Sequence, residues 1–343
     1  MKAIIKATDQ AGSLQVTDMP APQPGPGEVL VQIKATGLCY SDVTILNNKY
    51  VGRKPVPIPL ILGHEGAGLI SELGRGVNAH SAGDRVVIEP LAGCGHCNQC
   101  LKGFKNMCQD WEHVGITRHG TFSEYIVVPV AQVHRIPDNV TFEEAALTEP
   151  FGLVVRSLEQ SKPMAGETVA ILGPGSLGIM HLLAYKASGA SKVIMVGLGK
   201  DRKRFDIART LGADHTINIE EKDPVKAILD ITDGEGVDIV VETANSPKAT
   251  QLTFDLVAPR GRIVLFGLYP KAEFSPVAML RKGLSVYGDV AQVTRQFLYA
   301  LKLLASDKIN LLSLITRRFS FDEAPEAFEV ARQGDMVKVI FKS

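Results

Sequence analysis

Four of the chain's five cysteines lie within fifteen residues and could bind one metal ion. Their spacing is C-x2-C-x2-C-x7-C, formed by Cys94, Cys97, Cys100 and Cys108. Short C-x2-C steps let thiolates converge, and a closed site of four thiolates has no open position, so we expect a structural zinc ion. Thiols that bind nothing are one alternative, and an iron–sulfur cluster is the other. It would need a fourth cysteine at x3 followed by proline, whereas Cys108 comes at x7 and precedes Gln109.

The fifth cysteine, Cys39, belongs to a second set of possible zinc ligands, together with His64, Glu65 and Glu149. A thiolate, an imidazole and a carboxylate, with one position left for water or substrate, make up a catalytic zinc site. Each residue also has an ordinary interpretation. A single cysteine is usually a small buried apolar residue, and a Glu-Pro pair usually marks a boundary. Spacing alone does not join these positions.

A glycine-rich turn, "LGPGSLG", follows the expected strand "TVAIL" and precedes an expected helix. Glycines in a G-x-G-x-x-G pattern at such a junction let the backbone approach a pyrophosphate, which the helix N-terminus then binds. A tight turn without a ligand is the alternative. The predicted cofactor contacts are Gly173, Pro174, Gly175, Ser176, Leu177 and Gly178.

The composition indicates a soluble globular protein of about two domains. The chain has 343 residues, 45% of them hydrophobic, and a formal net charge of zero. A neutral chain without a basic stripe does not favour a nucleic acid or a membrane as partner. We find no signal-peptide pattern and no apolar run long enough to span a bilayer. We therefore expect a cytoplasmic location, where clustered cysteines more often bind metals than form disulfides.

The hydrophobic pattern predicts an α/β protein with two differently built parts. The first third contains short β patterns such as "EVLVQIKATG", separated by turn residues. From about residue 150 the pattern alternates strands and helices, which predicts a doubly wound parallel sheet. Its strands are "TVAIL", "KVIMV", "VDIVVETAN" and "GRIVLFGLY". Two helical patterns follow residue 290, and the last run, "KVIFKS", is a strand that needs a sheet to join.

These motifs together resemble the zinc-containing medium-chain dehydrogenases. "GHEGAG", the four-cysteine loop, "GPGSLG" and the change from β to β-α-β occur in that family's order, over nearly the full length. The branch of polyol (sorbitol) and threonine dehydrogenases is the most similar. The resemblance implies a GroES-like catalytic domain at 1–151 and 289–343, with a structural zinc lobe at about 90–110. It also implies an inserted Rossmann domain at 152–288.

The resemblance assigns roles to the candidate ligands. The four clustered cysteines would bind a structural zinc ion. Cys39, His64 and Glu65 would bind a catalytic one, with Glu149 as a fourth ligand that alternates with water. Ser41 lies where the family has a hydroxyl of its proton relay; it could also be the N-cap of the next helix, and both roles could hold. Asp42 corresponds to an aspartate near the metal, with a helix cap or a surface carboxylate as alternatives.

Two positions depart from that branch. Thr44 stands where these dehydrogenases often have a histidine, which puts the outer part of the proton relay in doubt. Arg156 stands seven residues after Glu149, where another histidine is common. This arginine either changes the substrate preference or is a surface residue.

The resemblance implies an enzyme that transfers a hydride from an alcohol to NAD(P), with zinc as the Lewis acid that lowers the pKa of the alcohol. The expected substrate is a polyol, a sugar alcohol or another secondary alcohol. Oxidation of an amino alcohol, as by a threonine 3-dehydrogenase, is the alternative. A non-catalytic zinc-lobed binding protein is an alternative of another class, which the intact ligand set disfavours. We expect a homo-oligomer, either a dimer or a tetramer.

The residues after the second strand of the Rossmann pattern predict a preference for NADP over NAD. An NAD enzyme normally ends this strand with an acid that binds the ribose 2′-hydroxyl. Here Gly197 stands at that point. A glycine leaves room for a 2′-phosphate, and nearby cations could pair with it. The candidates are Lys200, Arg202 and Arg204. A solvated helix start is the alternative, and Asp201 could still reach the ribose.

Overall fold

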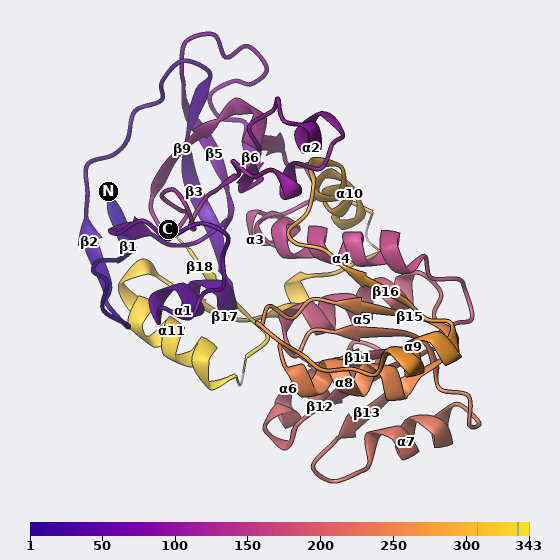
Figure 1. The fold of residues 1–343 in the computed structure, drawn as a ribbon. Helices are drawn as coiled ribbons and strands as arrows, with labels where there is room; N and C mark the ends of the chain where they lie inside the picture. Colours follow the sequence, from indigo (N-terminus) through magenta and orange to yellow (C-terminus); the bar gives the residue numbers. More distant parts are fainter. Residues whose placement is uncertain (307, 335, 343) are drawn as a thin grey trace. The chain divides into compact units, whose positions relative to one another are not determined.

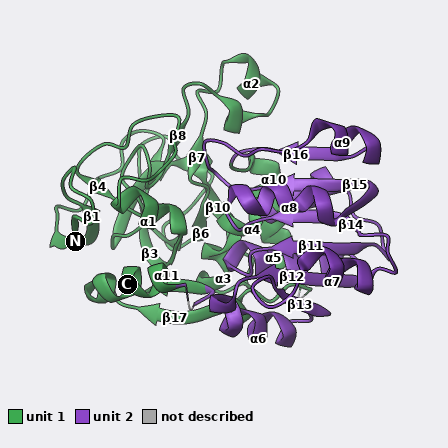
Figure 2. Ribbon diagram, turned by 60° about the horizontal axis from the view of Figure 1, so that its bottom comes forward, with its two compact units in different colours: residues 1–153, 291–333, 338–343 green, residues 154–290, 334–337 purple. Residues whose placement is uncertain are grey.

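The computed structural model describes residues 1–306, 308–334 and 336–342, and the chain divides into two compact units (Figures 1 and 2). Unit 1 comprises residues 1–153, 291–333 and 338–343, and unit 2 comprises residues 154–290 and 334–337. Within the described ranges, every helix is too short or too polar to cross a bilayer.

Unit 1 is built around a mainly antiparallel sheet with the order β10-β6-β5-β3-β18-β17, in which β9 also pairs with β3. A smaller sheet has the order β2-β1-β4, and β7 pairs with β8. The strands are β1 (Lys2–Lys6), β2 (Leu14–Asp18), β3 (Glu28–Leu38), β4 (Leu60–Ile61), β5 (Glu65–Leu73), β6 (Arg85–Ile88), β7 (Leu91–Ala92), β8 (Glu112–His113), β9 (Tyr125–Pro129), β10 (Val133–Arg135), β17 (Ile315–Phe319) and β18 (Lys338–Phe341). The first third is therefore rich in short strands, as predicted.

The last strand of the chain completes this sheet. β18 lies antiparallel to β3, with Val339 opposite Leu38, and parallel to β17. This confirms the prediction that the C-terminal run is a strand that joins a sheet. The pairing also brings Lys338 beside the end of β3, one residue before Cys39.

Unit 1 also contains helices. They are α1 (Tyr40–Leu46), α2 (Asn98–Leu101), α3 (Phe142–Ala146), α10 (Thr294–Leu304) and α11 (Ala324–Gln333). Of these, α3 packs against the interior strands β3, β5 and β6. The long helix α4 (Thr148–Ser161) begins in unit 1 and ends in unit 2. Alternate apolar residues of β3, such as Val29, Val31 and Ile33, are fully buried and form a core with residues of β5, β6 and β9.

Unit 2 contains six parallel strands in the order β13-β12-β11-β14-β15-β16, which confirms the predicted doubly wound sheet. The strands are β11 (Thr168–Leu172), β12 (Lys192–Gly197), β13 (His215–Asn218), β14 (Val237–Glu242), β15 (Val257–Leu265) and β16 (Ser285–Gly288). The helices are α5 (Ser176–Ala187), α6 (Arg202–Thr210), α7 (Pro224–Ile231), α8 (Pro247–Leu256) and α9 (Pro276–Lys282).

The strand order of unit 2 predicts a ligand site where that order reverses, at the carboxyl ends of the strands. After β11 the chain adds β12 and β13 on one side, and then crosses to add β14, β15 and β16 on the other. Ligands of open α/β sheets bind outside the carboxyl ends of the strands where the order reverses, which here is between β11 and β14. The glycine turn directly follows β11 and so lies at this point.

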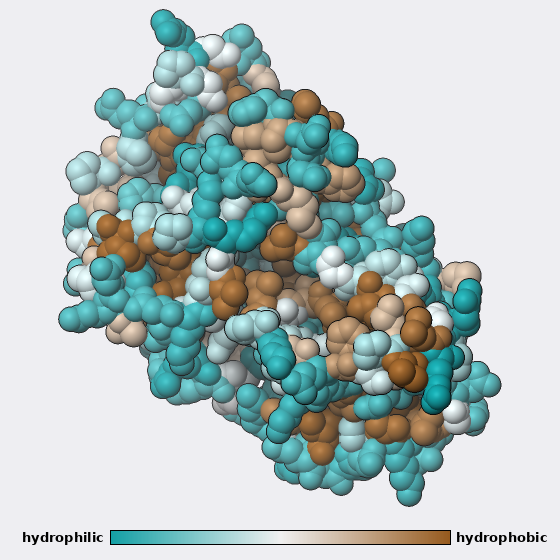
Figure 3. All heavy atoms as spheres, in the orientation of Figure 1, coloured by the Kyte–Doolittle hydropathy of each residue, from teal (hydrophilic) through white to brown (hydrophobic). Residues whose placement is uncertain are grey.

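On the face drawn in Figure 3, hydrophilic residues predominate and hydrophobic residues lie between them. Some large apolar side chains are nevertheless exposed. Three of them, Leu101, Phe104 and Met107, lie in the loop that carries the clustered cysteines. Four others, Leu268, Phe274, Val277 and Leu280, lie in the segment that precedes β16, a strand at the edge of its sheet.

Candidate metal centre and cofactor site

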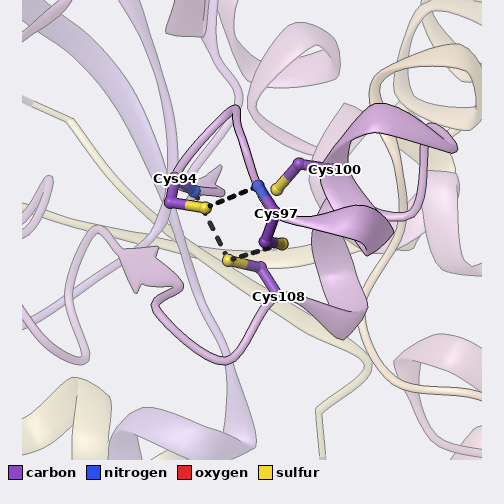
Figure 4. A group of neighbouring side chains, drawn as sticks. All are labelled: Cys94, Cys97, Cys100 and Cys108. Carbon is purple, nitrogen blue, oxygen red and sulfur yellow. Dashed lines mark hydrogen bonds between the residues drawn. The ribbon is translucent and has the colours of Figure 1, made fainter.

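The four clustered cysteines converge on one point (Figure 4). Their sulfur atoms all lie within 4.8 Å of one another, and the Sγ atoms of Cys97 and Cys108 are 3.8 Å apart. Zn–S bonds of about 2.3 Å in a tetrahedron place two sulfurs about 3.8 Å apart. Sulfurs that converge in this way fit a single ion better than a multi-iron cluster, whose cysteines bind separate irons. All five cysteines of the chain are free thiols.

The local backbone explains this convergence. Gly95 and Gly103 have φ values of +81° and +86°, a region that side chains other than glycine rarely adopt. The backbone N–H of Cys97 donates to Cys94 Sγ at 3.4 Å. A hydrogen bond from the Cys100 backbone lowers the pKa of the Cys97 thiol to about 7, while burial raises the pKa of Cys100 to about 12. One thiolate is therefore readily available at neutral pH to start metal binding.

Cys39, His64 and Glu65 also gather, with one ligand atom of each within 4.8 Å of the others. Two strands bring them together. Cys39 directly follows β3, and His64 directly precedes β5, which pairs with β3 so that Gly37 lies opposite Glu65. Gly37 is required here, because a Cβ at this position would lie 1.9 Å from Glu65 Oε2.

Asp42 orients Cys39 and His64. Its carboxylate is fully buried and accepts hydrogen bonds from the backbone N–H groups of Cys39 at 3.0 Å and Gly63 at 3.1 Å. Asp42 Oδ1 also lies 3.5 Å from His64 Nδ1, which leaves Nε2 as the donor for a metal. Asp42 is thus both a cap of α1 and a partner of the metal-binding histidine, and the surface alternative is wrong.

The electrostatic environment of His64 favours a positive charge at this site. Burial disfavours the imidazolium, but Asp42 and Cys39 outweigh it and hold the pKa of His64 well above its usual value. A metal cation can satisfy the same anions once the imidazole is neutral. Ser41 Oγ lies 3.5 Å from His64 Nε2. The N-cap of α1 is Cys39 rather than Ser41, so that alternative for Ser41 is wrong.

The sequence reasoning missed a buried cation, Lys338. Its side chain is 3% exposed, and its Nζ donates to Glu65 Oε1 at 2.6 Å and to the Leu38 carbonyl at 3.2 Å. No sequence signal marks it except a lysine at the start of an otherwise apolar strand. A divalent zinc ion and Lys338 would carry three positive charges against four negative ones, those of the Cys39 thiolate and of the carboxylates of Asp42, Glu65 and Glu149. The donor set therefore fits a zinc ion.

Glu149 lies near this group but outside its tightest part. Burial raises the pKa of Glu149, His64 opposes that rise, and Glu65 adds to it. The Nε2 of Gln292 donates to Glu149 Oε1 at 3.1 Å. Gln292 is 1% exposed and was also missed, because 143 residues separate it from Glu149.

A second histidine next to His64 was missed as well. The rings of His113 and His64 have centroids 5.5 Å apart in an edge-to-face arrangement. Burial, together with the nearby His64, lowers the pKa of His113 to about 3, so this imidazole is neutral at physiological pH.

The glycine turn of unit 2 has the shape of a dinucleotide cradle. Gly173 has a φ of +99°, and a Cβ on Gly178 would lie 2.0 Å from the Gly173 carbonyl oxygen. A Cβ on Gly175, by contrast, would meet no atom within 4 Å. The open space at Gly175 therefore admits a ligand's pyrophosphate. Ser176 Oγ, at the first turn of α5, is buried without a hydrogen-bond partner among the described residues. The turn thus fits the predicted cofactor.

Comparisons with known proteins agree with this geometry. Residues 25–138 match the family model "Alcohol dehydrogenase GroES-like domain", and residues 176–306 match "Zinc-binding dehydrogenase". The chain is 38% identical to an L-threonine 3-dehydrogenase of Pyrococcus furiosus, over 99% of this chain and 98% of the relative. It is 32% identical to a sorbitol dehydrogenase of Halalkalibacterium halodurans, over 99% and 98%.

Two solved structures have the same fold. One, a protein of Sinorhizobium meliloti 1021 bound to NADP, superimposes with a TM-score of 0.92 at 31% identity, over 100% of this chain and 99% of that one. The other, an alcohol dehydrogenase of E. coli CFT073 complexed with NADH, has a TM-score of 0.91 at 28% identity, over 100% and 99%.

The chain belongs to the zinc-binding medium-chain alcohol dehydrogenase family. This confirms the resemblance, the GroES-like and Rossmann parts of the fold, and the expectation of a zinc-dependent NAD(P) dehydrogenase. Its zinc sites are the four-cysteine cluster and the group of Cys39, His64 and Glu65. The alternative of a non-catalytic binding protein is set aside.

Two of the dehydrogenase's candidate 2′-phosphate residues are engaged elsewhere. Arg204 donates to the Met336 carbonyl at 2.8 Å and pairs with Asp201 at 3.3 Å. Arg202 pairs with Glu221 at 3.2 Å. Asp201 itself is 5% exposed and accepts from the backbone N–H of Leu198 at 3.0 Å. Asp201 therefore caps the turn instead of reaching outward.

The remaining candidates for contact with a 2′-phosphate are Lys200 and Gly197, and the carboxylate of Glu220 lies in the same turn. Lys200 is exposed, directly after Gly199, whose backbone N–H donates to Glu220 Oε2 at 2.7 Å. A Cβ on Gly197 would lie 2.8 Å from Pro174 Cδ and 3.0 Å from Asp201 Oδ2. Close packing of the turn therefore contributes to the requirement for glycine at this position.

The two positions that depart from the branch are both explained in part. Thr44 Oγ1 donates to the Ser41 carbonyl at 2.9 Å, inside α1. Arg156 is 2% exposed, and its guanidinium lies over the ring of Phe266 at 4.8 Å. The interpretation of Arg156 as a surface residue is wrong.

Proposed function

We propose that this enzyme oxidises a polyol, a sugar alcohol or another secondary alcohol at the Cys39–His64–Glu65 site. The observation that carries the proposal is the convergence of these three donors within 4.8 Å beside the buried Lys338. Cys39, His64 and Glu65 would hold the zinc ion, whose chemistry there would be that of a Lewis acid for the alcohol, and the cofactor would be the hydride acceptor.

The chain's own residues orient the donors and move the proton. Asp42 lies 3.5 Å from His64 Nδ1 and directs Nε2 toward the other ligands. Ser41 Oγ, 3.5 Å from His64 Nε2, is placed to take the hydroxyl proton outward. Glu149, whose Oε1 accepts a hydrogen bond from Gln292, would be the fourth ligand of the zinc ion and would alternate with water.

The charges of the site favour an uncharged substrate. A zwitterionic amino alcohol needs a cation for its carboxylate, since an unpaired buried charge is costly. The cation that the described residues place at this site, Lys338, already donates to Glu65 and Leu38. A polyol needs only hydroxyl partners.

Threonine is the second candidate, because the relative of Pyrococcus furiosus at 38% identity is an L-threonine 3-dehydrogenase. The test is kcat/KM for a panel of polyols, secondary alcohols and L-threonine, with both cofactors. A polyol or simple secondary alcohol should be the best substrate. Turnover of threonine far above the rest would replace this proposal with the second candidate.

We further propose that NADP is preferred over NAD. Gly197 carries no carboxylate to repel a 2′-phosphate, and the exposed Lys200 can pair with one. The Sinorhizobium meliloti neighbour, which binds NADP, supports this choice. Glu220 opposes it, because its carboxylate holds the Gly199 N–H and must release it when a phosphate enters.

Substitutions of Lys200 and Glu220 test the cofactor preference. Gly197→Asp is less suitable, because its side chain would crowd Pro174 and Asp201, and a packing defect could then not be told from a change in selectivity. Lys200→Ala should lower kcat/KM for NADP and leave that for NAD nearly unchanged, and Glu220→Gln should shift preference further toward NADP. Arg202→Ala, which removes a cation paired with Glu221, is the control. A wild-type enzyme that prefers NAD would contradict the proposal.

The remaining proposals concern assembly and location. We propose that the enzyme is cytoplasmic and that it forms a homo-oligomer, a dimer or a tetramer. The oligomer is supported by exposed apolar side chains in the segment before the edge strand β16, namely Leu268, Phe274, Val277 and Leu280. Five free thiols support a reducing compartment. Light scattering of the purified enzyme gives the mass that tests the first part.

A further inference from the structure

The cysteine lobe joins the rest of unit 1 beside the catalytic group. β7 precedes the first clustered cysteine and β8 follows the last, and the two strands pair with Leu91 opposite His113 and Ala92 opposite Glu112. The two ends of the lobe are thus joined by the short β7–β8 ladder. The last residue of that ladder is His113.

His113 is held firmly against His64. Its ring meets the His64 ring at a centroid distance of 5.5 Å and an angle of 68°, and the residue is 6% exposed. Its Nδ1 donates to the Val114 carbonyl at 2.8 Å. The chain that follows packs on the residue before His64, since a Cβ on Gly115 would lie 2.1 Å from the Gly63 carbonyl oxygen. Any shift of His113 therefore reaches the His64 backbone as well as its ring.

Trp111 and Arg53 extend this contact back to the lobe. Trp111 is 5% exposed and meets the His113 ring edge-on at 6.3 Å. The guanidinium of Arg53 lies over the Trp111 ring at 5.1 Å and donates to the Asn106 carbonyl at 2.8 Å and to the Cys108 carbonyl at 3.5 Å. Arg53 belongs to the loop between α1 and β4, which lies in sequence between Cys39 and His64. The lobe therefore contacts the segment between Cys39 and His64 through Arg53, in addition to the contact of His113 with His64.

We propose that the four-cysteine lobe positions the catalytic zinc ligands, with His113 and Trp111 as the contacts that transmit its structure to His64. A closed thiolate site fixes the ends of the β7–β8 ladder, and the ladder fixes the ring that packs on His64. Groups that orient a metal's ligands typically change metal affinity by about 10–100-fold when they are removed. The lobe is thus a part of the catalytic site as well as a stabilising clip.

This inference rests on the zinc chemistry of the Cys39 site, and the two can fail separately. Wild-type protein that binds zinc at the lobe alone would refute the zinc chemistry. The coupling is tested only by the variants below. Each is made in the full-length protein, and zinc retained per chain is measured by elemental analysis across chelator-buffered zinc concentrations, which resolves the two sites as separate steps.

His113→Ala should weaken the affinity of the Cys39–His64–Glu65 site for zinc, seen as the catalytic step of the titration, by about 10-fold. The affinity of the four-cysteine site, the other step, should stay unchanged. His113→Phe, which keeps a ring against His64, should restore most of the loss. Cys108→Ser opens the lobe without touching a catalytic ligand, and it should weaken the catalytic step too. Lys54→Ala is the control, because it breaks only an exposed lobe contact, the 3.0 Å pair with Asp110.

An unchanged catalytic step in His113→Ala, with only the unfolding temperature lowered, would mean that His113 is ordinary core packing and would overturn the proposal. Equal losses in the alanine and phenylalanine variants would overturn it as well. If His113→Ala does not fold, Arg53→Ala decides, since this side chain is exposed. The proposal expects a weaker catalytic step in Arg53→Ala, and an unchanged one would refute it.

Discussion

Lys338→Met is the most informative single change, because it leaves a buried carboxylate without its cation. Lys338 Nζ lies 2.6 Å from Glu65 Oε1, and the two side chains are 3% and 0% exposed. Methionine keeps most of the length of lysine, being one heavy atom shorter, and removes its charge. Breaking a buried ion pair by removing one partner costs about 3–5 kcal/mol. For a unit of this size that corresponds to a fall of roughly 6–20 °C in the unfolding temperature.

The stability lost in Lys338→Met should depend on whether zinc is bound. In metal-free protein Lys338 is the cation that hydrogen-bonds to Glu65, so we expect the larger cost. In zinc-loaded protein the metal offsets the Glu65 charge, so we expect a smaller one. The thermodynamic cycle then requires the variant to bind catalytic zinc more tightly than wild type, by the difference between the two losses.

The chain offers a direct assay and a matched control. Its single tryptophan, Trp111, is buried in unit 1, so its fluorescence reports the unfolding of that unit. Lys342→Met removes a nearby lysine whose pair with Glu143 is half exposed, and it should cost about 0–1 kcal/mol. Equal losses for Lys338→Met and Lys342→Met without metal, or the same Lys338→Met loss with and without zinc, would refute this reasoning.

Three further predictions concern the lobe, the glycine turn and pH. Cys97→Ser or Cys108→Ser should lower the unfolding temperature more than kcat at saturating zinc, because the clip fixes a loop with little core; unchanged unfolding in both would remove the structural role. Gly175→Ala should leave stability unchanged but weaken NADP binding, measured by titration, whereas Gly178→Ala should cost about 1–3 kcal/mol because its Cβ would lie 2.0 Å from the Gly173 carbonyl oxygen. Tight cofactor binding by Gly175→Ala would show that the pyrophosphate lies elsewhere. Burial lowers the pKa of His181 to about 4, whereas a histidine in an unfolded chain titrates near 6.5. Between those pH values the unfolded chain binds a proton that the folded one refuses, so stability falls as pH falls through this window. His181→Leu should reduce that fall in urea unfolding midpoints from pH 7 to 5, and an unchanged slope would contradict the assignment.

Features that neighbouring residues determine were predictable from the sequence. The strand β12 and the position of Gly197 at its end follow from a local hydrophobic run. The convergence of the four cysteines follows from spacing within fifteen residues. The joining of Cys39 to His64 did not follow from spacing and depended on resemblance to a family. The structure gives the physical reason, since the pairing of β3 with β5 brings them together.

Features that depend on distant pairings were not predictable. Lys338 meets Glu65 across 273 residues because β18 joins β3, and no local pattern shows which strand a C-terminal run will join. Gln292 meets Glu149 across 143 residues. Ser41 was considered as an N-cap because serine is common there, but Asp42 accepts the Cys39 N–H and shifts the cap to Cys39.

The most direct test of the central claim is to count zinc and measure turnover in Cys39→Ser. If Cys39, His64 and Glu65 hold the catalytic metal, the variant should retain one zinc ion per chain where wild type has two, unfold at a similar temperature, and show no turnover of the best alcohol. The four-cysteine site should keep its zinc, because its sulfurs are untouched. Wild-type turnover in Cys39→Ser, or retention of both zinc ions, would contradict the assignment of the catalytic site.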